Sequence, residues 1–344
     1  MAKTVTPEFV RAGTRLAVLE MIRSGTTTYV DMYYFEEEIA RVTRAAGMRA
    51  VLGQTIIQFP VPDAKTPEEG LARTERFIRE FASDPLIVPA IAPHAMYTLD
   101  AATLRSVRQL ADRDRVPVII HLAETGSEVR TAAEQHKATP VGYLDSLGFF
   151  GPRTLGAHGV HLTPADIDIL KKRGVGISHN PESNMKLASG TAPVPALRQA
   201  QVPVGLGTDG AASNNDLDMF ESMRQAALLH KLVSNDPRTL PAADVLAMAT
   251  REGARAIGMD REIGSLEPGK RADLILVGMS SARQTPMYDP LSHLVYASRG
   301  DDVRTTIVNG KVLMRERKVL TLQEPAILAE ARRIAVQVAK AVGR

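Results

Sequence analysis

The sequence predicts an α/β protein built on a parallel sheet, followed by a small β subdomain. Segments of strand character alternate with amphipathic helical segments up to about residue 260, the pattern of parallel strands joined by crossover helices. Five of the seven predicted strands have His or Asp at or just past their C-terminal end. After Gly258 short β runs and turns replace the alternation, so we expect one domain over residues 1–260 and a second over 261–344.

The first domain is expected to alternate seven strands with helices. Residues 6–24 have an apolar helical side that ends at Ser24-Gly25, and β-branched residues predict a strand over 26–31. The other strands are expected over 48–57, 86–92, 116–121, 153–158, 174–179 and 202–208. The other helices are expected over 36–46, 67–82, 100–114, 127–147, 164–173, 193–200, 215–233 and 241–257. Seven strands are one fewer than a closed eight-stranded barrel needs.

The second domain is predicted to contain a β-hairpin. Residues 303–308 and 311–314 flank Asn309-Gly310, and Asn-Gly between two β runs is a strong hairpin signal. Another strand is expected over 274–277, and residues 323–342 are expected to form a final amphipathic helix on the body of the protein.

The strand that leads to His121 carries the first candidate site. Three β-branched apolar residues, Val118 to Ile120, precede it, which is typical of a strand covered on both faces. At the C-terminal end of a barrel strand, a His can bind a metal and Glu124, three residues later, can move a proton. The alternative is a core histidine and a solvated glutamate at a helix start.

Composition excludes several functions. Lys and Arg number 42 against 39 Asp and Glu, and without a long basic run nucleic acid is not an expected partner. With no cysteine, a metal would need His, Asp or Glu ligands. No apolar run is long enough to span a bilayer, and the first residues lack the apolar core of a signal peptide. We therefore expect a cytoplasmic protein.

Motifs at the strand ends carry a resemblance to a known family. The motifs are Pro93–Tyr97, His121–Thr125, Gly156–His158, Ser178–Leu187 and Gly207–Asn214, with a turn at Glu267–Leu274. In this order they closely resemble the amidohydrolase superfamily, and within it the 5-methylthioadenosine/S-adenosylhomocysteine deaminases and related chlorohydrolases. The resemblance covers nearly the whole chain. It implies a (β/α)8 TIM-type barrel, here without its first strand, and a β-sandwich.

The resemblance also implies a site for one divalent metal ion, with zinc expected. His121 would be a metal ligand, and Asp209 a second ligand that also accepts a proton from the attacking water. Glu124 would carry a proton to a ring nitrogen of the substrate. His158 would hydrogen-bond the hydroxide or the forming oxyanion, and His94 would contact the nucleoside.

The other histidines are expected to play different parts. His161 competes with His158 for the same role, and we favour His158 because it ends its strand. His179 and Asn184 resemble residues that anchor the site or its loops. The histidines expected on the surface or in packing are His136, His230 and His293.

The chain departs from the family at the metal ligands. The family's first barrel strand ends in a His-x-His pair that supplies two ligands, whereas the first histidine here is His94 and no His-x-His occurs. Either the chain is a truncated form of an ordinary deaminase, or it is complete and its metal site has decayed. The remaining motifs are intact, which favours truncation. His121, Asp209 and His158 would then bind metal weakly, in an open barrel with unpaired strand edges.

The expected activity is hydrolytic deamination of an adenine nucleoside thioether, S-adenosylhomocysteine or methylthioadenosine, to the inosyl product and ammonia. Replacing an aromatic amine at neutral pH needs a hydroxide, which a divalent ion supplies by lowering the pKa of bound water to about 7. One alternative is a hydrolase of the same branch, a guanine deaminase or a triazine chlorohydrolase. Another is a non-catalytic fragment that binds nucleoside. The resemblance also makes a homo-oligomer possible.

Overall fold

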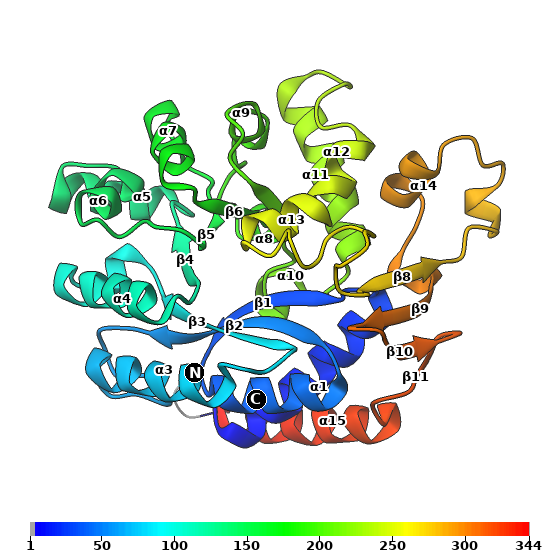
Figure 1. Ribbon diagram of the computed structural model, residues 1–344, viewed down its shortest axis with the longest axis horizontal. Coiled ribbons are helices and arrows are strands. Elements are labelled where there is room, and N and C mark those ends of the chain that lie inside the picture. The colour runs from blue at the N-terminus through cyan, green and yellow to red at the C-terminus, as the bar shows by residue number, and fades with distance from the viewer. Residues whose placement is uncertain (1–3, 344) are drawn as a thin grey trace.

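The larger of two sheets forms most of a barrel. The computed structural model describes residues 4–343. Its main strands are β1 (Thr28–Tyr33), β2 (Arg49–Ile56), β3 (Ile87–Pro93), β4 (Val118–Leu122), β5 (Thr154–His158), β6 (Gly176–His179) and β7 (Val204–Leu206). They pair in chain order, all parallel, and the sheet curls with helices along its outside (Figure 1). The predicted TIM-type fold class with seven strands is confirmed. Among the described residues, no strand joins β1 to β7.

A repeated Thr-Pro pair starts four of the helices around the sheet. In each, the Thr hydroxyl accepts a hydrogen bond from a backbone N–H of the first turn, and Pro occupies the first helical position, where its missing N–H costs nothing. These helices are α1 (Pro7–Ser24), α3 (Pro67–Phe81), α6 (Pro140–Ser146) and α7 (Pro164–Arg173). The other helices up to β7 are α2 (Glu36–Ala46), α4 (Ala101–Asp114), α5 (Gly126–His136), α8 (Pro181–Lys186) and α9 (Val194–Gln199), with the 3-10 turn η1 (Met96–Thr98).

Two of the predicted helices are wrong in extent. The helix expected over 127–147 is two helices, because Lys137 ends α5 in the left-handed conformation and Thr139-Pro140 starts α6. The helix expected over 241–257 divides at Thr250, which leaves the helical conformation. The helices between β7 and the next strand of the chain, over residues 274–277, are α10 (Ala211–Asn214), α11 (Met219–Ser234), α12 (Ala242–Met248) and α13 (Arg251–Ala256). No helix within residues 4–343 is both long and apolar enough to cross a membrane.

The smaller sheet is antiparallel and lies beside the barrel (Figure 1). Its strands are β8 (Leu274–Val277), β9 (Val303–Val308), β10 (Lys311–Arg315) and β11 (Lys318–Val319), and β8 is linked to β9 through η2 (Ala282–Gln284), α14 (Pro290–Tyr296) and η3 (Gly300–Asp302). The predicted Asn309-Gly310 turn is confirmed between β9 and β10, with both residues at positive φ as a type I′ turn requires. The final helix α15 (Glu324–Ala341) packs along α1, where Glu330 accepts two hydrogen bonds from Arg15.

A buried ion pair joins the two sheets. Arg49, the first residue of β2, donates from Nε and Nη2 to the two carboxylate oxygens of Asp273, just before β8, at 2.6 and 3.2 Å. Each side chain is 2% exposed. Asp273 also accepts from the backbone N–H of Asn309, and Arg49 donates to the carbonyl of Pro85. The charges are therefore matched by hydrogen bonds, as burial requires.

Replacing Asp273 by Ala should lower the free energy of unfolding by about 3–5 kcal/mol, because the Arg49 guanidinium would stay buried without its partner. Urea denaturation measures this loss. The double variant Arg49→Met with Asp273→Leu should recover most of it. Arg41→Ala is the control, since the half-exposed Arg41 side chain pairs with Glu38 and Glu80 at the surface, and each of these pairs should contribute less than about 1 kcal/mol. A loss from Asp273→Ala no larger than that of the control would contradict the role of the buried pair.

Candidate active site

Parallel pairing brings three of the predicted histidines to one edge of the sheet. In the register of β4 and β5, His121 lies opposite Ala157 and Leu122 opposite His158. His94 directly follows β3, and the backbone N–H of His121 donates to its carbonyl at 3.0 Å. The ring centroids of His94 and His121 are 4.8 Å apart, and those of His121 and His158 are 5.6 Å apart and nearly parallel. The three imidazoles thus form a row along the C-terminal ends of β3, β4 and β5.

His121 is held in one tautomer. Its Nδ1 lies 2.8 Å from the carbonyl oxygen of His94. A carbonyl can only accept, so Nδ1 carries the proton and Nε2 keeps a free lone pair. Burial, and secondarily the neighbouring His158, lower the pKa of His121, which favours the neutral ring. A neutral imidazole with a free Nε2 is the form that binds a metal.

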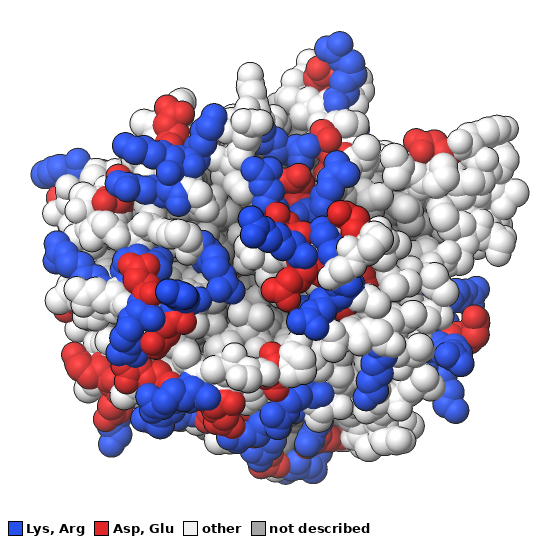
Figure 2. Space-filling model, viewed as in Figure 1, with Lys and Arg blue, Asp and Glu red and all other residues white. Residues whose placement is uncertain are grey.

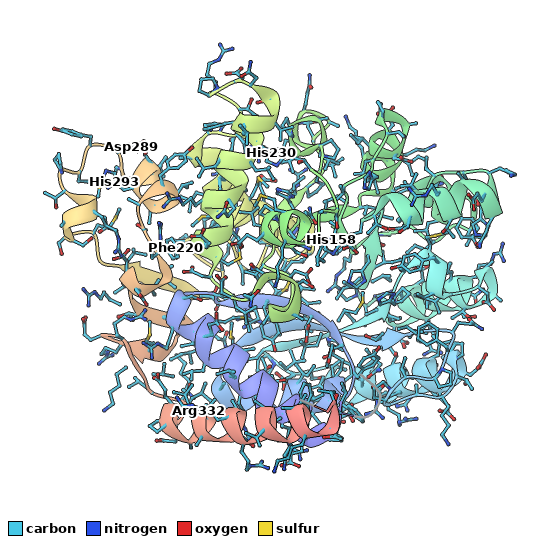
Figure 3. The ribbon with its side chains drawn as sticks, turned by 180° about the vertical axis from the view of Figure 1, so that it is seen from behind. His158, Phe220, His230, Asp289, His293 and Arg332 are labelled. Atoms are coloured by element: carbon cyan, nitrogen blue, oxygen red, sulfur yellow. The ribbon has the colours of Figure 1, made fainter. Side chains whose placement is uncertain are left out.

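His158 lies between two carboxylates. Its Nε2 is 3.8 Å from Oε2 of Glu124 and 3.9 Å from Oδ2 of Asp209. The imidazole is 2% exposed, whereas the carboxylates are 18% and 24% exposed. Figure 3 shows His158 in the middle of the molecule, at the end of β5. The structure therefore brings together His121, Glu124, His158 and Asp209, which the sequence places far apart.

The C-terminal ends of β3 to β7, with the residues that directly follow them, form the rim of the barrel. Left-handed backbone conformations occur at three places on this rim. Ala123, His158 and Asp209 have φ values of 49°, 74° and 62°, which cost free energy in residues other than glycine and persist where surrounding contacts hold them. At the turn after β4, Glu128 accepts from the backbone N–H groups of Ala123 and Glu124 at 3.0 and 2.8 Å. Glu128 was not predicted as a site residue; its place four residues after Glu124 was the available signal.

The strand end before Asp209 leaves room for glycine alone. A Cβ on Gly207 would lie 2.4 Å from Oδ1 of Asn180 and 2.7 Å from Oγ of Ser178. Asp209 itself accepts from the hydroxyl of Ser183 at 2.6 Å and from the backbone N–H of Gly210 at 2.6 Å. Both of its oxygens therefore have a donor within the protein. Sequence reasoning did not identify Ser183, because nothing in the sequence shows which side chain meets Asp209.

His94 lies at the edge of the row. Its Nδ1 is 3.3 Å from the hydroxyl of Thr98, and its ring meets Tyr97 edge-on with centroids 6.1 Å apart. Burial, and secondarily His121, lower the pKa of His94 to about 4. The ring is therefore neutral near pH 7 and can accept or donate one hydrogen bond to a bound molecule.

The other histidines lie outside this cluster. His161 is hydrogen-bonded through Nε2 to the carbonyl of Ser189 at 2.9 Å, so it does not compete for the place of His158. His179 and His230 form a buried pair with their Nε2 atoms 3.1 Å apart, and His230 projects from α11 (Figure 3). One of these nitrogens must carry the proton and the other accept it. Burial lowers the pKa of both rings, that of His230 to about 4.

The donor atoms on the rim are of a kind that binds metal ions, but the ligands are fewer than a zinc site uses. His121 offers a free Nε2 and Asp209 a carboxylate, both ordinary ligands of divalent ions. Zinc sites in proteins use three or four protein ligands. Among residues 4–343, no group of three or more His, Asp or Glu side chains is arranged to hold a metal. His121 and Asp209 therefore have donors that suit a divalent ion, but these two described residues are fewer than an ordinary zinc site uses.

The surface charge gives no sign of a polyanionic partner on the face that Figure 2 shows. Blue Lys and Arg side chains alternate with red Asp and Glu over its helices, and no single sign dominates. This agrees with the formal net charge of +3. A continuous basic stripe, which nucleic-acid binding would need, is absent from this face.

Comparison with known proteins gives consistent matches. The model of the amidohydrolase family matches residues 1–313. A 5-methylthioadenosine/S-adenosylhomocysteine deaminase of Syntrophobacter fumaroxidans is 47% identical over 331 residues, 96% of this chain and 76% of that protein. A 5′-deoxyadenosine deaminase of Methanosarcina mazei is 46% identical over 333 residues, 96% of this chain and 76% of the relative.

Solved structures agree. The crystal structure of an adenosine deaminase from Xanthomonas campestris with bound zinc superposes with a TM-score of 0.97 at 42% identity, covering 98% of this chain and 77% of that one. An atrazine chlorohydrolase from Arthrobacter aurescens complexed with zinc gives a TM-score of 0.89 at 22% identity, covering 96% of this chain and 78% of the other, and this likeness shows the fold alone.

The His179–His230 pair should make the free energy of unfolding depend on pH. Because the pKa of His230 is lower in the folded chain than the ordinary value of about 6.5, the unfolded chain binds more protons between about pH 6.5 and pH 4. The free energy of unfolding should fall as the pH drops through this window, with His230, which is 3% exposed, contributing about 3 kcal/mol.

His230→Gln should flatten the pH dependence of stability, since an amide can still donate to His179 without titrating. Urea denaturation at pH 4.5, 5.5, 6.5 and 7.5 measures the slope for both proteins. Equal slopes for wild type and variant would show that His230 titrates normally.

Proposed function

This chain belongs to the amidohydrolase family, and we propose that it catalyses the hydrolytic deamination of an adenine nucleoside that carries a 5′-thioether. S-adenosylhomocysteine or 5-methylthioadenosine would react with water to give the inosyl product and ammonia. The observation that supports this most is the position of His158, with Nε2 within 4 Å of the carboxylates of both Glu124 and Asp209. The relative named as a 5-methylthioadenosine/S-adenosylhomocysteine deaminase supports the thioether substrate. The relative named as a 5′-deoxyadenosine deaminase supports an adenine nucleoside modified at the 5′ position.

The reaction adds water to the ring carbon that bears the amino group. One proton of the water goes to one carboxylate, and the ring nitrogen beside that carbon gains a proton from a second carboxyl group. The first carboxyl group then protonates the amine, so that the C–N bond breaks and ammonia leaves. The remaining hydroxyl proton returns to the second carboxylate, which leaves the carbonyl oxygen of the inosyl product. This needs two proton-transfer groups on one side of the ring, which positioned carboxylates can provide. We assign acceptance of the water proton, and its later delivery to the amine, to Asp209. We assign protonation of the ring nitrogen to Glu124.

His158 would serve the oxygen of the attacking water. Its Nδ1 is engaged by Asn184, so Nε2 is the nitrogen available beside the two carboxylates. From that place it can accept a hydrogen bond from water and, once protonated, donate one to the oxyanion that forms. Its burial excludes competing water from the ring and strengthens such a bond.

His94 would bind the nucleoside. Its neutral ring stands next to His121 and beside the half-exposed Tyr97 at the open side of the rim. A neutral imidazole can hydrogen-bond a ribose hydroxyl or a ring nitrogen without bringing a charge. This supports the expected role of His94 as a substrate contact.

The implied metal ion is part of the proposal. His121 and Asp209 would hold a divalent ion, which we propose is zinc. Further ligands would be needed to complete an ordinary zinc site. When bound, such an ion lowers the pKa of a bound water to about 7 and so makes hydroxide available at neutral pH. Two protein ligands make a weaker site than the three or four of ordinary zinc sites, so we expect weak binding by this chain.

A second candidate is nucleoside binding without turnover. The observation that favours it is the shortage of metal donors within residues 4–343. The two functions have different requirements. Nucleoside binding would need the residues around His94, whereas deamination would also need a source of hydroxide.

Purified protein supplied with zinc and S-adenosylhomocysteine should show the ultraviolet change from the adenosine to the inosine chromophore, with release of ammonia. Zinc content is measured on the same sample after gel filtration. Binding of the nucleoside without spectral change, with less than about 0.1 zinc per chain, would support the second candidate, because metal affinity follows the ligands available. Turnover of guanine or a triazine in place of the adenine nucleosides would contradict the proposed substrate class.

Glu124→Gln should lower kcat by roughly 10²–10⁴ while nucleoside binding is largely retained, because the amide fills the same space but carries no proton for the ring nitrogen. Steady-state deamination assays and calorimetric binding measure the two effects separately. Glu134→Gln, on the exposed face of α5, is the matched control and should leave both unchanged. A Glu124→Gln protein with normal kcat would rule out the assigned proton transfer.

A further inference from the structure

The short helix α8 lies between the two strand ends that carry His158 and Asp209. It follows β6, which pairs with β5 on one side and β7 on the other. Two consecutive residues of α8 reach the two groups. The hydroxyl of Ser183 donates to Oδ2 of Asp209 at 2.6 Å, and Oδ1 of Asn184 accepts from Nδ1 of His158 at 2.9 Å. Ser183 and Asn184 are both fully buried.

The carboxylate oxygen that Ser183 contacts is the one that faces His158. Oδ2 of Asp209 receives the Ser183 hydroxyl and lies 3.9 Å from Nε2 of His158. Rotation of Asp209 about its side-chain bonds would break the Ser183 bond and lengthen the distance to His158. Ser183 therefore fixes the distance between the two groups as well as the direction of the carboxylate.

Asn184 determines which nitrogen of His158 carries a proton. Its carbonyl oxygen needs a donor, so Nδ1 holds the proton and Nε2 is left to face the carboxylates. The amide nitrogen of Asn180 also lies near Nδ1, but at 3.5 Å, the outer limit of a hydrogen bond. The shorter contact decides the tautomer.

α8 is itself fastened to the segments that follow β7. Glu182 accepts from the hydroxyl of Ser222 on α11 at 2.7 Å and from the side-chain amide of Asn214 on α10 at 3.2 Å. Lys186 donates to the carbonyl of Ala212 on α10 at 3.2 Å. Figure 1 shows α8 close to α10 at this end of the barrel. The helix therefore has a fixed place from which to hold side chains.

The backbone conformations of His158 and Asp209 explain why contacts from α8 would be needed. His158 and Asp209 each have a left-handed backbone conformation, which relaxes unless neighbouring contacts hold it. Hydrogen bonds from one short, anchored helix to both side chains restrain the two strand ends together.

We propose that Ser183 and Asn184 are positioning residues, which orient the carboxylate of Asp209 and the imidazole of His158 toward each other and toward bound substrate. Their effect on turnover rests on the proposed function. Their effect on geometry does not, so each part has its own test.

The role of Asn184 is tested by the ring nitrogens of His158 in ¹⁵N NMR, without turnover. The His158→Gln variant, whose spectrum lacks the signals of this ring, assigns them. Wild type and Asn184→Asp, which keeps an acceptor at this place, should show the proton on Nδ1. Asn184→Ala should lose that preference. An unchanged tautomer in Asn184→Ala would overturn the role of Asn184, whether or not the protein deaminates nucleosides.

The role of Ser183 is tested by the crystal structure of Ser183→Ala, in which the Asp209 carboxylate should turn out of contact with His158. An Asp209 side chain in its original place would overturn this role. Ser24→Ala is the matched control, because Ser24 is also buried and hydrogen-bonded through its hydroxyl but lies against Leu217, away from this contact. The two variants should unfold at similar urea concentrations.

If the chain deaminates nucleosides, Ser183→Ala should also lower kcat, on the order of 10–100-fold, with KM little changed, whereas Ser183→Thr should restore part of the rate by returning a hydroxyl. A kcat equal to that of Ser24→Ala would contradict the positioning role. Absence of turnover in wild type, with the NMR and crystallographic results as expected, would overturn the proposed function and leave the positioning role intact.

Discussion

The parallel register of β3 to β7 is the constraint from which the rest of the structure follows. Parallel strands need crossover helices, and each crossover returns the chain so that every strand ends at the same edge. His94, His121, His158 and Asp209 come from four different strand ends and meet for this reason alone. A shift of one residue in any pair would turn that strand's side chain to the opposite face of the sheet. The backbone hydrogen bonds of the sheet thus set the distances between these side chains.

Much of this could be predicted from the sequence, because the signals are local. The alternation of strands and helices, the polar strand ends and Asn309-Gly310 each occupy a few consecutive residues, and each corresponds to the feature observed. The break between α5 and α6 also has a local signal, since Thr139-Pro140 repeats the start of three other helices. The bonds of Ser183 and Arg49 could not be predicted, since each joins residues whose contact is created by the fold.

Burial divides the charges of the rim into two kinds. His94 and His121 have lowered pKa values because the protein removes their rings from water, so they enter the site as neutral donors or ligands. Glu124 and Asp209 stay partly exposed, where solvent and substrate can reach them. In the proposed reaction, proton transfer would fall to Glu124 and Asp209, the partly exposed groups of the rim. His179 and His230 instead face each other, with their Nε2 atoms 3.1 Å apart.

Two imidazoles of the rim are oriented by the same physical means. His121 and His158 each have Nδ1 beside a carbonyl oxygen, at 2.8 and 2.9 Å, and each therefore presents Nε2 to the shared space. For His121 the acceptor is the backbone of His94, which no substitution of a side chain can remove. For His158 it is the side chain of Asn184, which α8 must hold in place. The orientation of His121 is thus a consequence of the sheet, whereas that of His158 depends on a helix of six residues and on the bonds that anchor it. The orientation of His158 is therefore the one that a side-chain substitution can change, since its acceptor is a side chain.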